Sequence, residues 1–251
     1  MRAMRFTTGS LLTLTFAALL TACAPRAVQP PVGNGLRAAF SDAGVVWAEG
    51  GRACVARAPS FVRACPAVGR VVDVNWHAAQ AWAASPDLGL VATLDGAPQT
   101  LAVGAVVALS AQSIYREDGS ALTYAGAAAA GVPGRPSLAV TGGDGLDYVL
   151  LGGQLVRVGD GRVLDPLAGP FLALTPSGVR VTPSPAVDTA FGSYWLRNSR
   201  LERVDAAGKV LASVPHAAGQ VGLVGSLVVT VSSGGQVRAF GTDLTEVPLN
   251  Y

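Results

Sequence analysis

Short apolar runs separated by turn-forming residues make up most of the chain after residue 35. Segments rich in Val, Leu, Tyr and Trp, such as VVWAE, YVLL and YWLR, are interrupted by Gly, Asn, Asp and Pro, and no segment keeps a helical period. This pattern is typical of an all-β protein, in which each run is a strand and each interruption is a turn.

The predicted strands recur in units. LVRVGDGRVL at 155–164 matches LERVDAAGKVL at 201–211, and each follows a strand and a two-residue turn. Turns of this kind give six anchors, at Gly50, Asp87, Asp118, Gly152, Asn198 and Gly234. The intervals between them are 37, 31, 34, 46 and 36 residues. Gly and Asn suit these positions because they accept the positive φ of tight hairpin turns.

A recurrence near about 40 residues, with three or four strands per unit, predicts a β-propeller. Each small sheet stacks on the next around a ring, and this leaves only short, protected sheet edges. Six anchors predict one propeller domain of six blades over residues 36–251. Five or seven blades stay open, because the interval before Asn198 is long and because we expect the first blade to share strands with the C-terminus. A two-sheet β-sandwich is the alternative fold.

The repeat resembles the blades of bacterial Trp-docking, PQQ-type and WD40-like propellers. In the first two, a D-x-x-G-K turn joins the outer strands, and the matching residues here are Asp205 to Lys209. The resemblance implies a propeller body and, by analogy with other bacterial envelope propellers, a loop face that binds protein partners. It implies no particular activity, because fold does not fix function.

The first residues follow a different pattern. Arg2 and Arg5 precede an apolar stretch from Leu11 to Leu20, which is the layout of a secretory signal peptide. The stretch is too short to span a bilayer, which needs roughly 20 apolar residues.

The signal ends in LTAC at residues 20–23 and resembles the lipobox of bacterial lipoproteins. In that family the chain is cut before the Cys, and the thiol and the new N-terminus are acylated. The resemblance implies a signal peptide over residues 1–22, lipidation at Cys23 and a Pro- and Gly-rich tether to residue 35. An ordinary signal cut near Ala22 is the alternative.

Acylation at Cys23 would hold the protein on a membrane of the bacterial cell envelope, since several acyl chains give stable anchoring. Ala24 follows the Cys where an Asp would favour retention in the inner membrane. In a double-membraned cell we therefore expect the periplasmic side of the outer membrane.

Charge argues against nucleic acid as a partner. Arg2 and Arg5 belong to the signal, so the 16 remaining Lys and Arg residues balance the 16 Asp and Glu residues. Nucleic-acid binding needs a basic surface. Charged residues are 14% of the chain, against about 25% in typical globular proteins.

Cys54 and Cys65 are predicted to form a disulfide. An oxidising compartment permits such a bond, and the stretch between them reads as two short strands joined by a turn at Ala58-Pro59-Ser60. This arrangement places the two sulfur atoms side by side across a hairpin.

Catalytic motifs are missing from the sequence: it has no GxSxG, P-loop, GxGxxG or HExxH. In VDVNWH at 72–77, the side chains of Asp73, Asn75 and His77 share one face of a strand because side chains alternate. They form either a solvated strand face or, less simply, a site that orients water or holds a metal. We expect no catalytic residue, no metal and no cofactor.

Recurring charged residues outside that strand have structural interpretations. Asp144, Asp147 and Asp160 lie in Gly-rich stretches that turn formation explains better than calcium binding. The arginines that recur at one register predict carboxylate pairing between blades or, more sharply, a ring around a ligand funnel; they are Arg157, Arg203 and Arg238.

The sequence thus predicts a lipid-anchored propeller that acts as a non-catalytic scaffold for binding or assembling an envelope protein partner. The alternative is a propeller hydrolase or lactonase-like enzyme with a metal in the central funnel. Three or more carboxylate or Asn side chains that converge in the funnel would favour the enzyme. An apolar funnel with an apolar patch on one rim would favour the scaffold.

Overall fold

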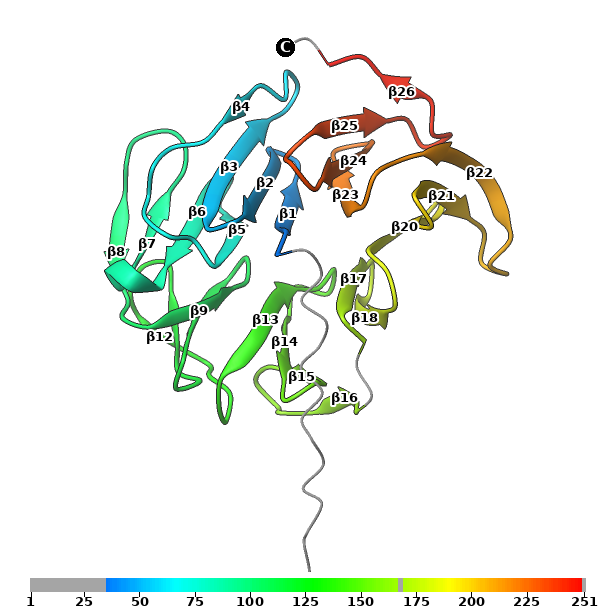
Figure 1. The fold of residues 1–251 in the computed structure, drawn as a ribbon. Coiled ribbons are helices and arrows are strands. Elements are labelled where there is room, and N and C mark those ends of the chain that lie inside the picture. Colours follow the sequence, from blue (N-terminus) through cyan, green and yellow to red (C-terminus); the bar gives the residue numbers. More distant parts are fainter. Residues whose placement is uncertain (1–34, 167–168, 250–251) are drawn as a thin grey trace, which may run out of the picture.

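Six sheets arranged around a central axis form the protein, as the computed structural model in Figure 1 shows. The structure describes residues 35–166 and 169–249. Its regular elements are strands joined by turns and loops, with one short 3₁₀ turn at Pro86–Leu88. The fold is a six-bladed β-propeller, which confirms the all-β prediction and the blade number and excludes the β-sandwich. The predicted signal peptide and Cys23 lie outside the described residues.

Blades 1 to 3 are regular four-stranded sheets. Their strands are β1 (Arg37–Ser41), β2 (Gly44–Glu49), β3 (Arg52–Arg57), β4 (Arg63–Ala64), β5 (Asp73–His77), β6 (Gln80–Ser85), β7 (Leu90–Thr93), β8 (Thr100–Ala102), β9 (Val106–Leu109), β10 (Ser113–Arg116), β11 (Ala121–Thr123) and β12 (Ala128–Ala129). Within each blade the strands pair in sequence order and are antiparallel.

Blades 4 to 6 follow the same order, with one insertion. Their strands are β13 (Pro136–Thr141), β14 (Asp147–Leu151), β15 (Gln154–Arg157) and β16 (Val163–Asp165) in blade 4; β19 (Ala186–Thr189), β20 (Gly192–Arg197), β21 (Arg200–Val204) and β22 (Val210–Pro215) in blade 5; and β23 (Gly219–Val224), β24 (Leu227–Ser232), β25 (Val237–Phe240) and β26 (Glu246–Val247) in blade 6. The inserted strands are β17 (Phe171–Thr175) and β18 (Gly178–Thr182).

The six anchor turns all connect the second strand of a blade to its third. Gly50, Gly152 and Gly234 have φ values of 58°, 58° and 94°, and Asn198 has 52°. These are the left-handed conformations that the tight turns were expected to need. The anchors therefore count the blades correctly.

The long interval before Asn198 has a structural cause. The hairpin of β17 and β18, here called the half-blade, stands between blades 4 and 5 and has no third or fourth strand. Strand β17 runs parallel to β19, and Leu174 lies opposite Val187. It thus takes the place of a seventh innermost strand in the ring (Figure 1).

The ring closes without exchanging strands, so the prediction that blade 1 shares strands with the C-terminus was wrong. Blade 1 holds only β1–β4 and blade 6 only β23–β26. Apolar packing closes the seam instead, where Trp47 and Val45 of blade 1 share a buried cluster with Val229 and Val231 of blade 6. Gly222 is required there, because a Cβ on it would lie 2.3 Å from the Phe40 ring.

The disulfide between Cys54 and Cys65 is confirmed. Val55 and Ala64 lie opposite each other across β3 and β4, which brings the neighbouring cysteines together with an S–S distance of 2.02 Å. The bridge joins two strands of one blade, so it staples a hairpin and not the ring.

Candidate functional site: the central channel

The innermost strands of the blades surround a channel with a volume of about 740 Å³. Around the ring they are β1, β5, β9, β13, β17, β19 and β23. They run in one direction because every blade repeats the same strand order. One end of the channel, the turn face, therefore carries the turns that follow the inner strands. The other end, the entry face, is where the inner strands begin and where the described chain starts at Gly35.

The channel wall is mainly apolar. Branched and aromatic side chains come from every inner strand except β9 and from the turn after β19; they include Phe40, Val74, Trp76, Leu138, Val140, Leu172, Leu174, Val187, Phe191, Val221 and Leu223. Small residues such as Ala78, Ala79 and Ala111 complete much of the rest. A concave, mostly apolar cavity with a few polar groups is the usual form of a binding site.

The rim at the turn face is apolar and carries little charge. Phe191 is 67% exposed, Leu146 is 43% exposed and Leu174 is 38% exposed. The turns that follow the inner strands contain no Lys or Arg in the described residues, and their acidic residues are Asp42 and Asp144. The turn face therefore carries exposed apolar side chains and few charged ones.

The predicted polar row on β5 proves to be a connection between blades. Asp73 accepts hydrogen bonds from the backbone N–H groups of Val74 (3.0 Å) and Leu109 (2.8 Å). Asn75 donates to the carbonyl oxygen of Leu109 (2.8 Å), and His77 donates through Nδ1 to that of Ala111 (2.8 Å). We call Asp73, Asn75 and His77 the latch, because they hold blade 2 to blade 3.

The latch corrects the expectation of a solvated strand face. Asp73 is buried, with 6% of its surface exposed, and His77 stacks on Tyr124 with ring centroids 4.2 Å apart. Burial raises the pKa of Asp73 to about 6, against the opposing effects of the Arg37 charge and the two backbone N–H groups. The alternation of side chains was predicted correctly, but both faces of an inner strand are covered by neighbouring blades.

A second buried carboxylate joins blades 3 and 4. Asp147 accepts hydrogen bonds from Ser110 Oγ (2.7 Å), the Tyr115 hydroxyl (3.0 Å) and Thr141 Oγ1 (2.6 Å). Desolvation and the nearby Asp147 raise the pKa of Tyr115. Sequence reasoning placed Asp147 in a turn, but it begins strand β14. Its spacing of 37 residues from Ser110, about one blade, was the available signal.

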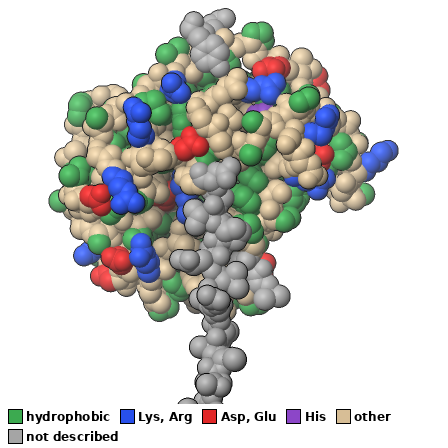
Figure 2. All heavy atoms as spheres, viewed as in Figure 1, with side chains coloured by type: hydrophobic (Ala, Val, Ile, Leu, Met, Phe, Trp, Pro, Cys, Tyr) green, Lys and Arg blue, Asp and Glu red, His purple; other side chains and the backbone are tan. Residues whose placement is uncertain are grey.

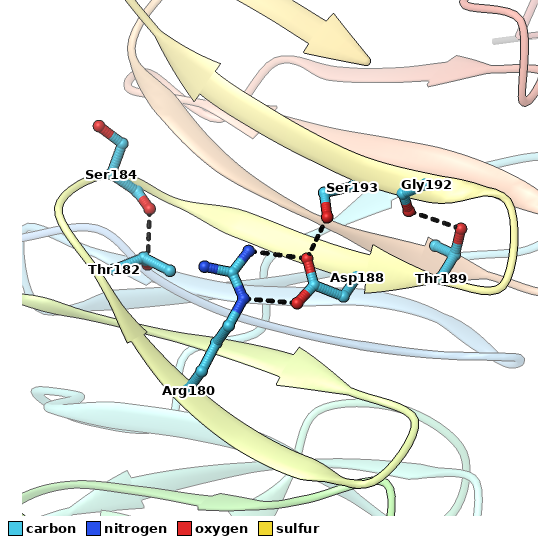
Figure 3. A network of polar contacts seen from close by, with 7 residues as sticks. All are labelled: Arg180, Thr182, Ser184, Asp188, Thr189, Gly192 and Ser193. Carbon is cyan, nitrogen blue, oxygen red and sulfur yellow. Dashed lines mark hydrogen bonds and ion pairs between the residues drawn. The ribbon is translucent and has the colours of Figure 1, made fainter. Parts of the chain in front are cut away.

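Figure 3 shows a third connection, between the half-blade and blade 5. The guanidinium of Arg180 on β18 makes a two-point ion pair with Asp188 on β19, and Ser193 Oγ donates to the same carboxylate (2.6 Å). Partial burial disfavours the charged carboxylate, but the hydrogen bonds from Arg180 and Ser193 outweigh it and lower the pKa of Asp188.

The arginines that recur at one register do not surround the channel. Arg157, Arg203 and Arg238 lie on the third strands of blades 4, 5 and 6, outside the channel lining. Arg157 pairs with Asp160 and Arg238 with Glu246, each within its own blade. Both the predicted funnel ring and the carboxylate pairing between blades were wrong.

The other sequence candidates are surface turns or buried structural groups. Asp160 accepts from the backbone of its own turn, as Asp205 does in the D-x-x-G-K turn between β21 and β22. His216 is buried, contacts Thr230 Oγ1 through Nε2 (2.6 Å), and has its pKa lowered by burial. The described residues include no group of three or more His, Cys, Asp or Glu side chains placed to hold a metal.

The surface and the helices add little to the site. On the face seen in Figure 2, basic and acidic side chains are interspersed and do not gather into a patch of one sign. In the residues that the structure describes, no helix has the length and apolar character needed to cross a membrane.

These features define a β-propeller with an apolar central channel. No protein-family model matches the sequence, and no curated protein matches it. The fold of this chain resembles the folds of several solved structures. BamB from Moraxella catarrhalis is 13% identical with a TM-score of 0.44, over 80% of this chain and 82% of that chain. Virginiamycin B lyase from Staphylococcus aureus is 11% identical with a TM-score of 0.40, over 83% and 85%. The WD40 propeller domain of Doa1 is 12% identical with a TM-score of 0.44, over 84% and 80%.

Proposed function

We propose that this chain is a lipoprotein of the bacterial cell envelope, anchored through acyl chains on Cys23, and that its propeller binds another envelope protein without catalysing a reaction. The contact is made by the turn face. In a double-membraned cell the protein would lie on the periplasmic side of the outer membrane.

The observation that carries the proposal is the apolar rim of the channel. Phe191 stands 67% exposed beside an apolar cavity, and Leu146 and Leu174 extend the same character along the turn face. Exposed apolar groups that cluster mark interaction sites, whereas scattered ones do not. A large aromatic side chain at the centre of such a surface is the kind of residue that dominates binding between proteins.

The direction of the chain also favours the turn face as the surface that binds the partner. The inner strand β1 begins at the entry face, and the residues that precede it come from the predicted anchor. A tether attached at the entry face leaves the turn face free on the opposite end of the propeller. A partner can therefore reach Phe191 without competing with the membrane.

The polar groups of the channel favour the scaffold over the enzyme. Four carboxylate or Asn side chains of the described residues line the channel, and each already has hydrogen-bond partners on the backbone or on side chains; they are Asp42, Asp73, Asn75 and Asp188. Asp73 and Asn75 on β5 tie blade 2 to blade 3, and Asp188 on β19 pairs with the half-blade, so these groups serve structural contacts. The hydrogen bonds that these groups already make favour the scaffold over the hydrolase alternative.

Site-specific crosslinking in the intact lipoprotein tests the proposal. A photoreactive residue in place of Phe191 should capture one partner, and Phe191→Asp should abolish recovery of that partner from native membranes. Val210, 43% exposed on the outer strand β22, is the matched control position. Equal capture from both positions, or an unacylated N-terminus on the purified protein, would contradict the proposal.

A further inference from the structure

The entry end of the channel is crossed by one arginine. Arg37, the first residue of β1, donates from Nη2 to the carbonyl oxygen of Ser137 on β13 (3.2 Å). Strand β13 is the third inner strand from β1 in one direction around the ring and the fourth in the other. The Arg37 side chain therefore reaches across the channel and forms a floor near the entry face.

Arg37 has charge and donors to spare. Among the described residues it belongs to no ion pair, and its contact with Ser137 uses one of the five N–H donors of a guanidinium. Asp73 is the carboxylate whose pKa the charge of Arg37 lowers, and both of its oxygens already accept hydrogen bonds from backbone N–H groups. Arg37 is also the sole Lys or Arg of the described chain that lines the channel.

The channel thus changes character along its length. Arg37 and Asp73 lie at the entry end, where β1 and β5 begin. Leu172 and Val187 lie one residue into their strands, and Leu174 and Phe191 lie nearer the turn face. Asp42 and Asp188 also line the channel nearer the turn face, and Asp188 is paired with Arg180. The volume of about 740 Å³ falls within the range of about 300–1,000 Å³ that holds small organic ligands. A guanidinium outside any ion pair of the described residues, at one end of a mainly apolar channel, complements a molecule with an anionic head and an apolar body.

We propose that the channel binds a single-chain amphiphile with a carboxylate head, such as a fatty acid. The head pairs with the guanidinium of Arg37, and the hydrocarbon chain extends along the apolar walls toward Phe191. Guanidinium groups favour carboxylates because two parallel N–H donors match the two oxygens. The ligand enters through the turn face, since Arg37 closes the other end.

Titration with decanoate tests this site. The full chain carrying Cys23→Ala is used, so that no detergent competes for the channel, and heat of binding is measured at neutral pH. We expect saturable one-to-one binding of decanoate and at least about tenfold weaker binding of decanol and decyltrimethylammonium, because a hydrogen bond to a charged group is worth roughly a factor of ten or more.

Two variants locate the ligand. Arg37→Gln should weaken decanoate binding at least about tenfold, while Arg52→Gln, an exposed arginine on β3, should leave it unchanged. Ala190→Trp should narrow the mouth and weaken binding to a similar extent, while Ala206→Trp in an outer turn should not. The second pair keeps the proposal testable if Arg37→Gln fails to fold.

Several results would overturn the proposal: equal binding of decyltrimethylammonium, decanoate binding that survives both channel variants, or no saturable binding. Binding to phosphatidylglycerol vesicles is measured separately. If the protein binds these vesicles through Arg37 and decanoate then no longer binds, the anion that Arg37 recognises belongs to a lipid bilayer. Failure of these titrations leaves the proposed protein contact at Phe191 intact, since they involve no partner protein.

Discussion

The carboxylate that joins blade 2 to blade 3 is buried, whereas the ion pair that joins the half-blade to blade 5 is partly exposed. In the first region, the closed sector, Asp73 and Asn75 bond to the backbone of Leu109 in the next sheet. In the second, the open sector, Arg180 and Asp188 keep 35% and 18% of their side-chain surfaces exposed. Hydrogen bonds to the backbone thus join the blades of the closed sector, and an ion pair between side chains joins the sheets of the open sector.

The difference follows from the missing outer strands of the half-blade. Trp195 lies opposite Glu202 on β21, and Glu202 lies opposite Ser213 on β22, so one face of blade 5 carries all three. Arg180 of the half-blade sits 4.8 Å from the Trp195 ring, which identifies this face as the one toward the half-blade. Beside Trp195 this face carries the polar side chains of Glu202 and Ser213, and Glu202 is paired with Arg197.

The opposite face of blade 5 confirms the rule. Tyr194, Leu196 and Leu201 point the other way and share a buried cluster with Val228 and Phe240 of blade 6. On blade 5, the side chains named toward the complete blade 6 are apolar, whereas those toward the half-blade include Glu202 and Ser213 beside Trp195. The two faces of blade 5 therefore differ in composition according to which neighbour each one contacts.

The largest expected contrast is between two aromatic residues. Tyr124 in the closed sector is 9% exposed, stacks on His77 and donates from its hydroxyl to Ser110 O (2.7 Å). Tyr124→Ala should lower the free energy of unfolding by about 3–5 kcal/mol, as for other large aromatic residues in cores. Trp195→Ala in the open sector should cost about 1 kcal/mol, because Arg180 and Arg197 stack on a partly exposed ring. Denaturant unfolding compares them, and equal losses would contradict the distinction.

The two carboxylates should respond to pH with opposite signs. Burial raises the pKa of Asp73 to about 6, so the folded protein keeps a proton that the unfolded chain loses above about pH 4. The stability contributed by Asp73 is therefore greatest below about pH 4 and falls by about 2–3 kcal/mol as the pH rises through 6. The pKa of Asp188 is lowered, so its contribution is present above about pH 4 and is lost on acidification.

Denaturant unfolding between pH 4 and pH 7 separates these cases. The stability advantage of the wild-type protein over Asp73→Ala should shrink as the pH rises, whereas its advantage over Asp188→Ala should grow. Curves that run in parallel would show that Asp73 is not desolvated in the folded protein.

Substitution of Asn75 tests the hydrogen bonds of the latch without removing the charge of Asp73. Its amide donates to Leu109 O, and its oxygen accepts from the N–H of Trp76 (2.8 Å). Asn75→Ala leaves both backbone groups without these partners, so it should cost about 1–2 kcal/mol at every pH, since an amide does not titrate in this range. Gln154→Ala, at an exposed position of β15, is the matched control and should change stability by less than about 0.5 kcal/mol. A pH-dependent loss for Asn75→Ala would implicate Asp73 instead.

The period of the chain predicted the blades well, because each anchor is a local turn whose backbone demands Gly or Asn. Asn198 and Gly234 illustrate this, with φ values of 52° and 94°. The half-blade lengthened the interval before Asn198 to 46 residues but supplied no anchor. An anchor turn connects the second strand of a blade to the third, and the half-blade ends after its second strand. A long interval cannot by itself distinguish an added hairpin from a long loop.

The environment of a side chain was harder to predict than its direction. Alternation placed Asp73 and His77 on one face, but what covers that face depends on the neighbouring blade. The latch residues contact groups 34–36 residues further along the chain, which is about one repeat. Polar residues that recur at such an offset were available as a signal, although the depth of burial was not. Arg37 carried no local pattern at all, because its partner lies 100 residues away.

The smallest expected effect concerns the ion pair that ties the half-blade to blade 5. Arg180→Ala should lower the free energy of unfolding by only about 1 kcal/mol, because partly exposed ion pairs are screened by solvent. The same change should speed amide hydrogen exchange in residues 171–182 while leaving β5 and β9 unaffected, since local opening depends on local contacts. Arg135→Ala, which breaks a more exposed pair with Glu117, is the control and should alter neither quantity measurably. Unchanged exchange in the half-blade would mean that its apolar packing on blade 4, through Leu172 and Val181, holds it without help from Asp188.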